Sequence, residues 1–204
     1  MGVDALSDAN AWAVGFHGET RRTDPLIEHW NGMRWRTKST PAIRGFEVEL
    51  YGVSAASPQE IWAVGRIDRS GGVLPLIEHW DGDAWSVEPI AVHGYLTAVS
   101  AGSATDVWAV GQRTDGRTLV MHLDGMGWSV VPSPSPGTGD HPFNLLSGVS
   151  AASNSDVWAV GEYFDTPTGQ HSLIEYWNGS TWTVQSHPDA PAFVGVSAGS
   201  ASNV

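Results

Sequence analysis

The stretch Asp156-Val157-Trp158-Ala159-Val160-Gly161 decides the fold, because the same phrase occurs four times in the chain. The other copies are residues 10–15, 60–65 and 106–111. Their tryptophans are Trp12, Trp62, Trp108 and Trp158, so the spacings are 50, 46 and 50 residues. Self-similarity at a period of about 20–50 residues is typical of solenoids, propellers and other arrays. The sequence therefore predicts a repeat architecture.

Turn signals divide each repeat into four short strands, which we call a, b, c and d. Strand a is an apolar stretch such as residues 146–151, and strand b is the Trp-Ala-Val-Gly phrase. Strand c is residues 26–30 in the first copy, and an Asn-Gly or Asp-Gly dipeptide follows it in every copy. These dipeptides are the strongest short-range hairpin signal. Strand d begins three residues beyond the glycine, at Trp35, Trp85, Trp128 and Trp182.

Strand b is apolar on both faces, which indicates a sheet packed between two like sheets. Four-stranded antiparallel sheets of about 45–50 residues are the blades of a β-propeller. The predicted fold is all-β, a β-propeller repeat array with four blades of four antiparallel strands plus the first strand of a fifth. As a single array over residues 1–204, it has blades at about 1–48, 49–94, 95–144 and 145–191, and the fifth starts at about 192–204.

Both ends of the chain fall inside a repeat. Residues 194–204 are equivalent to residues 1–11, and they stop one residue before the next expected tryptophan. We expect a fragment of a longer propeller, and a terminal strand that completes the first blade is the alternative. Open ends would expose strand edges and apolar blade faces, which favours self-association.

Composition excludes several classes of function. The net charge of −12 argues against a nucleic acid partner, because phosphate binding needs clustered Lys and Arg. The chain has no cysteine, hence neither disulfides nor thiolate metal sites, and no apolar run approaches the roughly 20 residues that span a bilayer. The stretch after Met1 lacks the pattern of a signal peptide. Composition leaves the compartment open.

The repeated pattern Gly-Val-Ser-Ala, Asp-Val-Trp-Ala-Val-Gly and Leu-Ile-Glu-His-Trp-Asp-Gly resembles bacterial β-propeller proteins of the kelch and galactose-oxidase-like kind. The hairpin at residues 81–85 looks like a degenerate Asp-box, with Trp80 where that motif has an aspartate. The resemblance implies an exported or cell-surface protein and a function as a binding module, a lectin or, in some members, an enzyme. The copper site of galactose oxidase cannot be carried over without its cysteine, and we expect no cofactor.

Two repeated features suggest ligand sites, and each has a structural explanation. In the Glu-His pairs Glu28-His29 and Glu78-His79, neighbouring side chains point to opposite faces of a strand, so one metal ion cannot be held by both. We expect the histidine to bond to the next blade. The residue before strand b could form a calcium ring, but a turn-closing role is favoured; these residues are Asn10, Glu60, Asp106 and Asp156. The repeated tryptophans are expected in the core.

The b–c and d–a connections vary in length from repeat to repeat, and in an up-and-down blade they lie on the same face. We call this the loop face and expect it to bind the ligand, because repeat proteins carry binding surfaces on their variable loops. The candidate ligand-binding residues are Arg66, Arg69, Arg113 and Tyr163 from b–c connections and His93, His141 and His187 from d–a connections. Three loop histidines could coordinate zinc, but we expect no metal.

The sequence thus predicts a non-enzymatic binding module whose partner is a protein or a glycan. Glycan binding predicts similar shallow pockets between blades, each with an aromatic platform, whereas protein binding predicts one continuous loop surface. The alternatives are a propeller glycoside hydrolase or lyase, which an arginine cluster would support, and a purely structural repeat array. The chain has no Gly-x-Ser-x-Gly elbow and no His-Glu-x-x-His motif.

Overall fold

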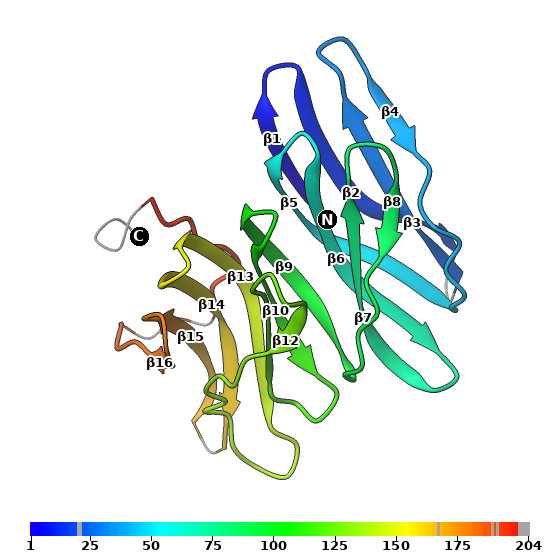
Figure 1. Cartoon of the computed structure of the whole chain (residues 1–204). Coiled ribbons are helices and arrows are strands. Elements are labelled where there is room, and N and C mark those ends of the chain that lie inside the picture. Colours follow the sequence, from blue (N-terminus) through cyan, green and yellow to red (C-terminus); the bar gives the residue numbers. More distant parts are fainter. Residues whose placement is uncertain (20–21, 167, 189, 191, 200–204) are drawn as a thin grey trace.

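A computed structural model of the chain describes residues 1–19, 22–166, 168–188, 190 and 192–199. In that part of the chain it contains sixteen β-strands and no helix. No described segment is a helix long and apolar enough to span a membrane. The strands fall into four groups of four, as the repeats predict (Figure 1).

Each group is one blade. Blade 1 is β1 (Gly2–Ser7), β2 (Asn10–Glu19), β3 (Arg22–Trp30) and β4 (Trp35–Lys38). Blade 2 is β5 (Glu47–Ser57), β6 (Glu60–Arg69), β7 (Gly72–Trp80) and β8 (Trp85–Val87). Blade 3 is β9 (Gly94–Ser103), β10 (Asp106–Arg113), β11 (Thr118–Leu123) and β12 (Trp128–Val130). Blade 4 is β13 (Phe143–Ser153), β14 (Asp156–Asp165), β15 (Gly169–Trp177) and β16 (Trp182–Val184).

Within a blade, consecutive strands pair antiparallel, and the short fourth strand is the outer edge. The first strands β1, β5, β9 and β13 follow one another and line the inner side of the array. A single parallel pair, Thr23 with Glu47, links blades 1 and 2. Figure 1 shows the sheets in sequence across the molecule, with blades 1 and 4 at opposite ends. The predicted all-β propeller fold is therefore confirmed.

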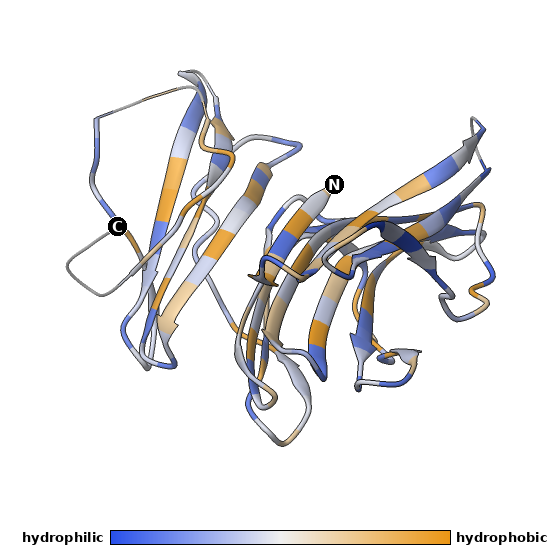
Figure 2. Ribbon diagram, turned by 90° about the horizontal axis from the view of Figure 1, so that it is seen from above, coloured by the Kyte–Doolittle hydropathy of each residue, from blue (hydrophilic) through white to orange (hydrophobic). Residues whose placement is uncertain are grey.

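The cores lie between blades. Strand b produces them because its alternate residues face opposite neighbours: Ala63 packs in the cluster shared with blade 1, and Trp62 and Val64 pack in the cluster shared with blade 3. A third cluster, around Trp108, joins blades 3 and 4. Figure 2 shows the apolar positions concentrated along the strands and the polar ones toward their ends and turns. As predicted, strand b is buried on both faces, and the repeated tryptophans Trp12, Trp62 and Trp108 lie in these cores.

A repeated hydrogen bond joins the inner strands of successive blades. The amide of Ala101 in β9 donates to Oγ of Ser54 in β5 at 3.1 Å, and the amide of Ala151 donates to Oγ of Ser100 at 3.0 Å. Between blades 1 and 2 the acceptor is Oδ2 of Asp4, 2.7 Å from the amide of Ala55. We call these the inner-strand bonds. They set the spacing of the blades on the inner side.

Residues 192–199, the described part of the predicted fifth copy, run beside β13. The amide of Ala198 donates to Oγ of Ser150 at 3.0 Å, which is the fourth inner-strand bond. The approach is close, because a Cβ on Gly148 would lie 2.9 Å from the Cα of Gly195. The segment thus takes the place of the next inner strand, although it is not itself assigned as a strand. Residues 200–204 lie outside the described residues.

The c–d hairpins close with four-residue loops. Trp80 pairs with Trp85, so residues 81–84 form the loop. Oδ1 of Asp81 accepts the amides of Asp83 and Ala84, both at 2.9 Å, and Gly82 has a φ of 99°, a conformation that favours glycine. These amide bonds hold the pKa of Asp81 below its ordinary value. The rings of Trp80 and Trp85 are 5.9 Å apart on one face of the hairpin, as the spacing predicts.

Candidate ligand-binding site

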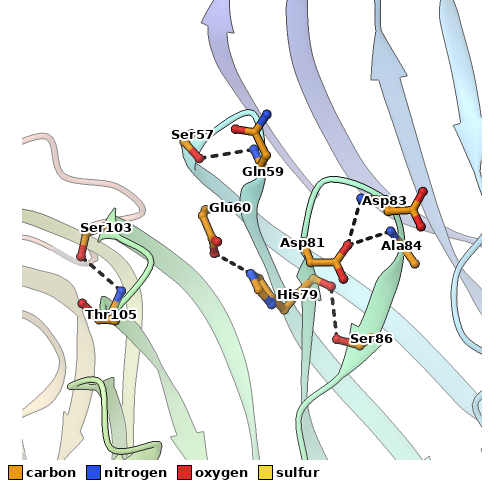
Figure 3. Close-up of polar contacts among 10 residues, drawn as sticks. All are labelled: Ser57, Gln59, Glu60, His79, Asp81, Asp83, Ala84, Ser86, Ser103 and Thr105. Atoms are coloured by element: carbon orange, nitrogen blue, oxygen red, sulfur yellow. Dashed lines mark hydrogen bonds and ion pairs between the residues drawn. The ribbon is translucent and has the colours of Figure 1, made fainter.

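The histidine of strand c belongs to a structural unit within its own blade. Nε2 of His79 lies 2.7 Å from Oε2 of Glu60 (Figure 3). The ring of His79 stacks on Trp62 with centroids 4.0 Å apart. Blades 1 and 3 repeat this unit with His29 on Asn10 and His122 on Asp106. Blade 4 has Tyr176 instead, and there Asp156 accepts the indole N–H of Trp158.

These contacts correct two predictions. The histidine bonds to the residue before strand b of its own blade and not to the next blade, because the c strand pairs directly with the b strand. In blades 1, 2 and 3 the residue before strand b therefore bonds to that histidine. A serine closes the a–b turn instead: Oγ of Ser57 accepts the amide of Gln59 at 3.3 Å, and Ser103 and Thr105 repeat this (Figure 3).

The d–a connections contact the b–c hairpins, so these two kinds of segment lie side by side. The amide of Phe46 donates to the carbonyl of Asp68 at 2.7 Å, and that of Thr138 donates to the carbonyl of Phe164 at 3.1 Å. The hairpins are longer than predicted, however. Arg66, Arg69, Arg113 and Tyr163 lie in strands b, not in loops, because the b–c ladder continues past the Trp-Ala-Val-Gly phrase to residues such as Arg69 and Gly72.

Arg66 sits in a half-buried polar cluster with Glu47, Glu49 and Tyr51, which we call the Arg66 cluster. Its Nη2 is 2.6 Å from Oε2 of Glu47, and its Nε is 3.0 Å from Oε2 of Glu49. The hydroxyl of Tyr51 donates to the same Glu49 carboxylate. Two carboxylates thus neutralise one guanidinium, and the cluster has no surplus positive charge to attract an anion.

Burial and these contacts decide the protonation states of Tyr51 and Arg66, and burial decides that of Tyr95. Burial and the bond to Glu49 raise the pKa of Tyr51 far above its ordinary value, and burial raises the pKa of Tyr95. Burial alone would lower the pKa of Arg66, but Tyr51 and the two carboxylates raise it. All these groups therefore stay in their usual protonation states at neutral pH, the tyrosines neutral and the arginine charged.

The remaining candidates are not brought into one site. Arg69 is exposed and lines a hollow of about 380 Å³ with Arg44, Glu88 and apolar residues of blades 1 and 2. Arg113 pairs with Asp115 at 3.4 Å, and Tyr163 stacks on His171 with centroids 5.1 Å apart.

The three loop histidines also stay apart from one another. His93 and His141 are exposed, and His187 contacts Phe193, with ring centroids 5.5 Å apart. Within the described residues, no group of three His, Asp or Glu side chains is placed to hold a metal ion.

A groove recurs at the outer rim of every blade interface. Each groove lies between the d–a connection of one blade and the tryptophans that flank the c–d loop of the next, which we call the c–d tryptophans; blade 3 has only Trp128. Sequence reasoning missed these grooves. Groove 1/2, of about 390 Å³, is lined by residues 38–41, Trp80 and residues 83–85. Groove 2/3, of about 260 Å³, is lined by residues 89–92, Met121, Trp128 and Val130. Groove 3/4, of about 350 Å³, is lined by residues 131–134, Trp177 and residues 180–182.

The grooves differ in polarity. In groove 1/2 the chain's single lysine, Lys38, lies over the Trp80 ring at 4.7 Å, and Asp83 lines the rim. Groove 3/4 is lined by Ser133, Ser180 and Thr181 beside Trp177; the Ser133 hydroxyl bonds to Thr118, and that of Ser180 donates to Asn178. Groove 2/3 has only apolar side chains. Two of the three grooves thus combine an aromatic floor with hydrogen-bonding groups.

Two buried carboxyl groups lie away from these grooves, on the c strands. Glu78 and Glu175 are fully buried, and their side-chain oxygens have no hydrogen-bond partner among the described residues. Burial raises the pKa of each to about 8. Both are therefore largely protonated at neutral pH, because an isolated carboxylate is costly inside a protein.

No family model and no curated protein sequence matches this chain. The similar solved structures include two lectins. One is the SapL1 lectin in complex with α-methyl fucoside, with a TM-score of 0.57 and 15% identity, over 90% of this chain and 61% of that one. The other is a variant of the Aleuria aurantia lectin in complex with Fucα1-6GlcNAc, with a TM-score of 0.59 and 16% identity, over 89% and 57% of the two chains.

A third similar structure is YCF48 bound to D1 peptide, with a TM-score of 0.54 and 13% identity. The match covers 91% of this chain and 52% of that one. This chain therefore spans between 52% and 61% of the length of these three proteins. At such low identity the likeness concerns the fold: this chain is built as a β-propeller array.

Proposed function

We propose that this chain is a non-enzymatic binding module for neutral glycans, and that the rim grooves hold the sugar. The observation that carries the proposal is the recurrence of one groove at all three blade interfaces, each with a tryptophan in its lining. Similar shallow pockets between blades are what glycan binding predicts. Concave sites lined by aromatic residues with a few polar groups suit small ligands of this kind.

Grooves 1/2 and 3/4 are the proposed subsites. In groove 3/4 the partly exposed indole ring of Trp177 offers an apolar surface for the apolar face of a sugar, and the exposed hydroxyl of Thr181 offers hydrogen bonds to its hydroxyls. The net charge of −12 disfavours acidic sugars, so we infer a neutral ligand. Two weak subsites on one rigid array would bind a multivalent glycan more tightly than either subsite alone.

The lectins among the similar structures are consistent with this function. We also propose that the protein is exported, as the resemblance to kelch and galactose-oxidase-like propellers implies. The glycoside hydrolase alternative is weaker. Burial raises the pKa of Tyr51, so its hydroxyl stays protonated at neutral pH although Glu49 accepts its hydrogen bond. Two carboxylates neutralise Arg66, and Arg113 pairs with Asp115, so these arginines lend no support to the hydrolase alternative.

A glycan-array screen of the 204-residue chain tests the proposal. The groove variant is Ala84→Arg with Thr181→Arg, because both side chains are exposed and line grooves 1/2 and 3/4. The matched control is Met126→Arg, which lies in the equivalent hairpin of blade 3 and is 93% exposed. We expect the groove variant to lose sugar binding by about tenfold or more and the control to keep it.

A second variant separates the grooves from the loop face. Arg66→Ala with Arg113→Ala leaves the grooves intact, so sugar binding should not change. Loss in this variant, with retention in the groove variant, would move the ligand to the loop face. An array with no bound sugar would contradict the glycan function itself.

A protein partner on the loop face is the second candidate function. The observation that favours it is the exposure of two aromatic side chains there, Phe46 at 58% and Phe164 at 45%. Exposed aromatics are enriched in protein interfaces. A partner protein retained by the wild-type chain and lost by Phe46→Ser with Phe164→Ser would support this function. Retention by the double variant would contradict it.

A further inference from the structure

Each of blades 2, 3 and 4 packs on the preceding blade through equivalent residues on one side of its sheet. We call this side of a blade its leading face. In blades 2, 3 and 4 the c-strand leucines of this face, Leu76, Leu119 and Leu173, are fully buried. Leu26, their equivalent in blade 1, is only partly buried. Trp85 and Trp182 are 6% and 5% exposed, whereas the equivalent Trp35 is 42% exposed. The leading face of blade 1 is therefore built for a neighbour that the described chain does not supply.

The opposite, trailing face of each blade shows the same contrast at the other end of the array. Ile27, Ile77 and Val120 are at most 1% exposed on the trailing faces of blades 1, 2 and 3. Ile174, the equivalent in blade 4, is partly exposed, and so is Trp158. In the internal interfaces this tryptophan position packs against the c–d tryptophans of the next blade, as Trp108 does with Trp177 and Trp182.

The leading face of blade 1 is also hollowed. An apolar hollow of about 380 Å³ lies over β1, β2 and β3 and is lined by residues 1–3, 13–16, Leu26 and Glu28. Val3 at its edge is 68% exposed. Contiguous exposed apolar surface of this kind marks an interaction site.

The inner-strand bond is open at the same place. Ala55, Ala101, Ala151 and Ala198 each donate their amide to the inner strand of the preceding blade. The equivalent amide in blade 1, that of Ala5, bonds instead to Oδ1 of its own Asp4 at 2.8 Å. An incoming strand with an acceptor at the position of Ser150 would restore the repeated bond.

We propose that copies of this chain associate head to tail, with the leading face of blade 1 in one copy packed on the trailing face of blade 4 in the next. A second copy is the favoured occupant of the leading face of blade 1. The trailing face of its blade 4 is equivalent to the trailing faces of blades 1, 2 and 3, on which the leading faces of blades 2, 3 and 4 pack inside the molecule. In the new interface, Trp158 meets Trp30 and Trp35 of the next copy, and Ser150 accepts the amide of that copy's Ala5.

The polarity of the faces favours this arrangement over a symmetric one. Two leading faces packed together would lack the b-strand tryptophan that fills each internal interface, as Trp108 does against Trp177 and Trp182. The head-to-tail contact is heterologous, so it extends into a chain of copies or closes into a ring.

Residues 193–199 compete with this contact. They lie on β13 where β1 of the next copy would lie, and they use the same acceptor, Ser150. Besides the Ala198 bond, the Phe193 amide donates to the carbonyl of Gly161 at 3.2 Å. β1, in contrast, pairs with β2 along its length. Association therefore displaces residues 193–199, and these residues set the concentration at which it occurs.

Sedimentation velocity of the full chain over a range of concentrations tests the proposal. We expect the wild-type chain to associate as its concentration rises. Val3→Arg and Ile174→Arg, one on each face, should each weaken association by about 30-fold or more, because each buries an unpaired charge. Met126→Arg, outside both faces, should behave as the wild type. Ala198→Pro removes the competing amide and should strengthen association.

A mixture of the two face variants distinguishes head-to-tail from symmetric contact. Each variant retains one intact face, so the mixture should form a one-to-one dimer and nothing larger. A wild-type chain that stays monomeric at all concentrations, together with a monomeric Ala198→Pro variant, would overturn the proposal. Association of Ile174→Arg at wild-type strength would also overturn it, because a symmetric blade 1 contact would then be responsible.

Discussion

Blades 2 and 3 differ at one buried position that their strand pattern treats as equivalent. The third residue of strand c faces the preceding blade. It is Glu78 in blade 2 and Met121 in blade 3, and both are buried in an interface between blades. Blade 4 resembles blade 2 and has Glu175 at this position. Blade 1 has Glu28 there, on its uncovered leading face. This position of the interface thus holds either a methionine or a glutamate, and burial favours the neutral acid form of the glutamate.

The largest expected effect is a pH dependence that blades 2 and 4 bring to the whole array. Glu78 and Glu175 have pKa values of about 8 in the folded protein, against an ordinary value of 4.5. Their folded pKa is raised, so the stability they contribute is fully present below about pH 4.5 and is lost as pH rises through about 8. In that range each carboxyl should lower the free energy of unfolding by up to about 1.4 kcal/mol per pH unit.

Urea denaturation at pH 5, 7 and 9 measures this dependence. The double variant Glu78→Met with Glu175→Met isolates it from other titrating groups, because the slope that disappears belongs to these two positions. Equal slopes in the wild type and the double variant would show that the two carboxyl groups are solvated in the folded protein.

The single change Glu78→Met makes blade 2 like blade 3. We expect it to raise the free energy of unfolding at pH 7 by about 1–4 kcal/mol, as replacement of a buried ionisable group by a hydrophobic one of similar volume often does. Glu28→Met is the matched control, since the same side chain there faces the hollow on blade 1. Chemical denaturation of both variants makes the comparison, and an equal response would mean that burial is not the cause.

A smaller effect is expected from the histidine that blades 2 and 3 share and blade 4 lacks. His79→Ala removes the bond to Glu60 and the stack on Trp62, and it should cost about 1–2 kcal/mol of stability. His79→Tyr copies Tyr176 of blade 4 and keeps the ring, so it should cost less. Thermal unfolding ranks the two variants, and the opposite order would show that ring size, not the hydrogen bond, limits this position.

The smallest effect concerns the inner-strand bonds. Ser100→Ala leaves the amide of Ala151 without its acceptor and should cost about 0.5–1.5 kcal/mol. Ser150→Ala removes the equivalent bond, from the amide of Ala198, at the end of the array. It should cost less, because this bond attaches only residues 192–199 and not a whole blade. Amide hydrogen exchange at Ala151 and Ala198 reports each bond directly. Unchanged exchange in both variants would mean that the serines do not protect these amides.

The fold could be predicted from the sequence because its signals are local and repeated. The Asn-Gly and Asp-Gly dipeptides fix the c–d hairpins, and a strand that is apolar on both faces requires two neighbouring sheets. The lengths of the b–c hairpins could not be read in this way. Residues such as Arg66 and Asp68 are polar, but the ladder continues through them because their partners in strands a and c extend equally far.

The candidate site was less accessible to sequence reasoning. His79 and Glu60 recur together in three blades as a histidine with an acid or amide partner, and this joint recurrence was the available signal for their bond. The rim grooves had no such signal. Each depends on the path of a d–a connection across the tryptophans of the following blade, a non-local arrangement of residues such as Pro132 and Trp177. The Arg66 cluster likewise depends on the register of two strands.

The inner-strand bonds have a consequence for how such arrays change in evolution. Each interface joins a serine hydroxyl or aspartate carboxylate of one repeat to a backbone amide of the next, and packs one tryptophan against the following blade. A backbone amide is present whatever the side chain, so this bond places no demand on the side chain of the following repeat at that position. An in-frame duplication or deletion of one repeat in the gene would therefore join two surfaces that already match, and blade number can change without new interface residues.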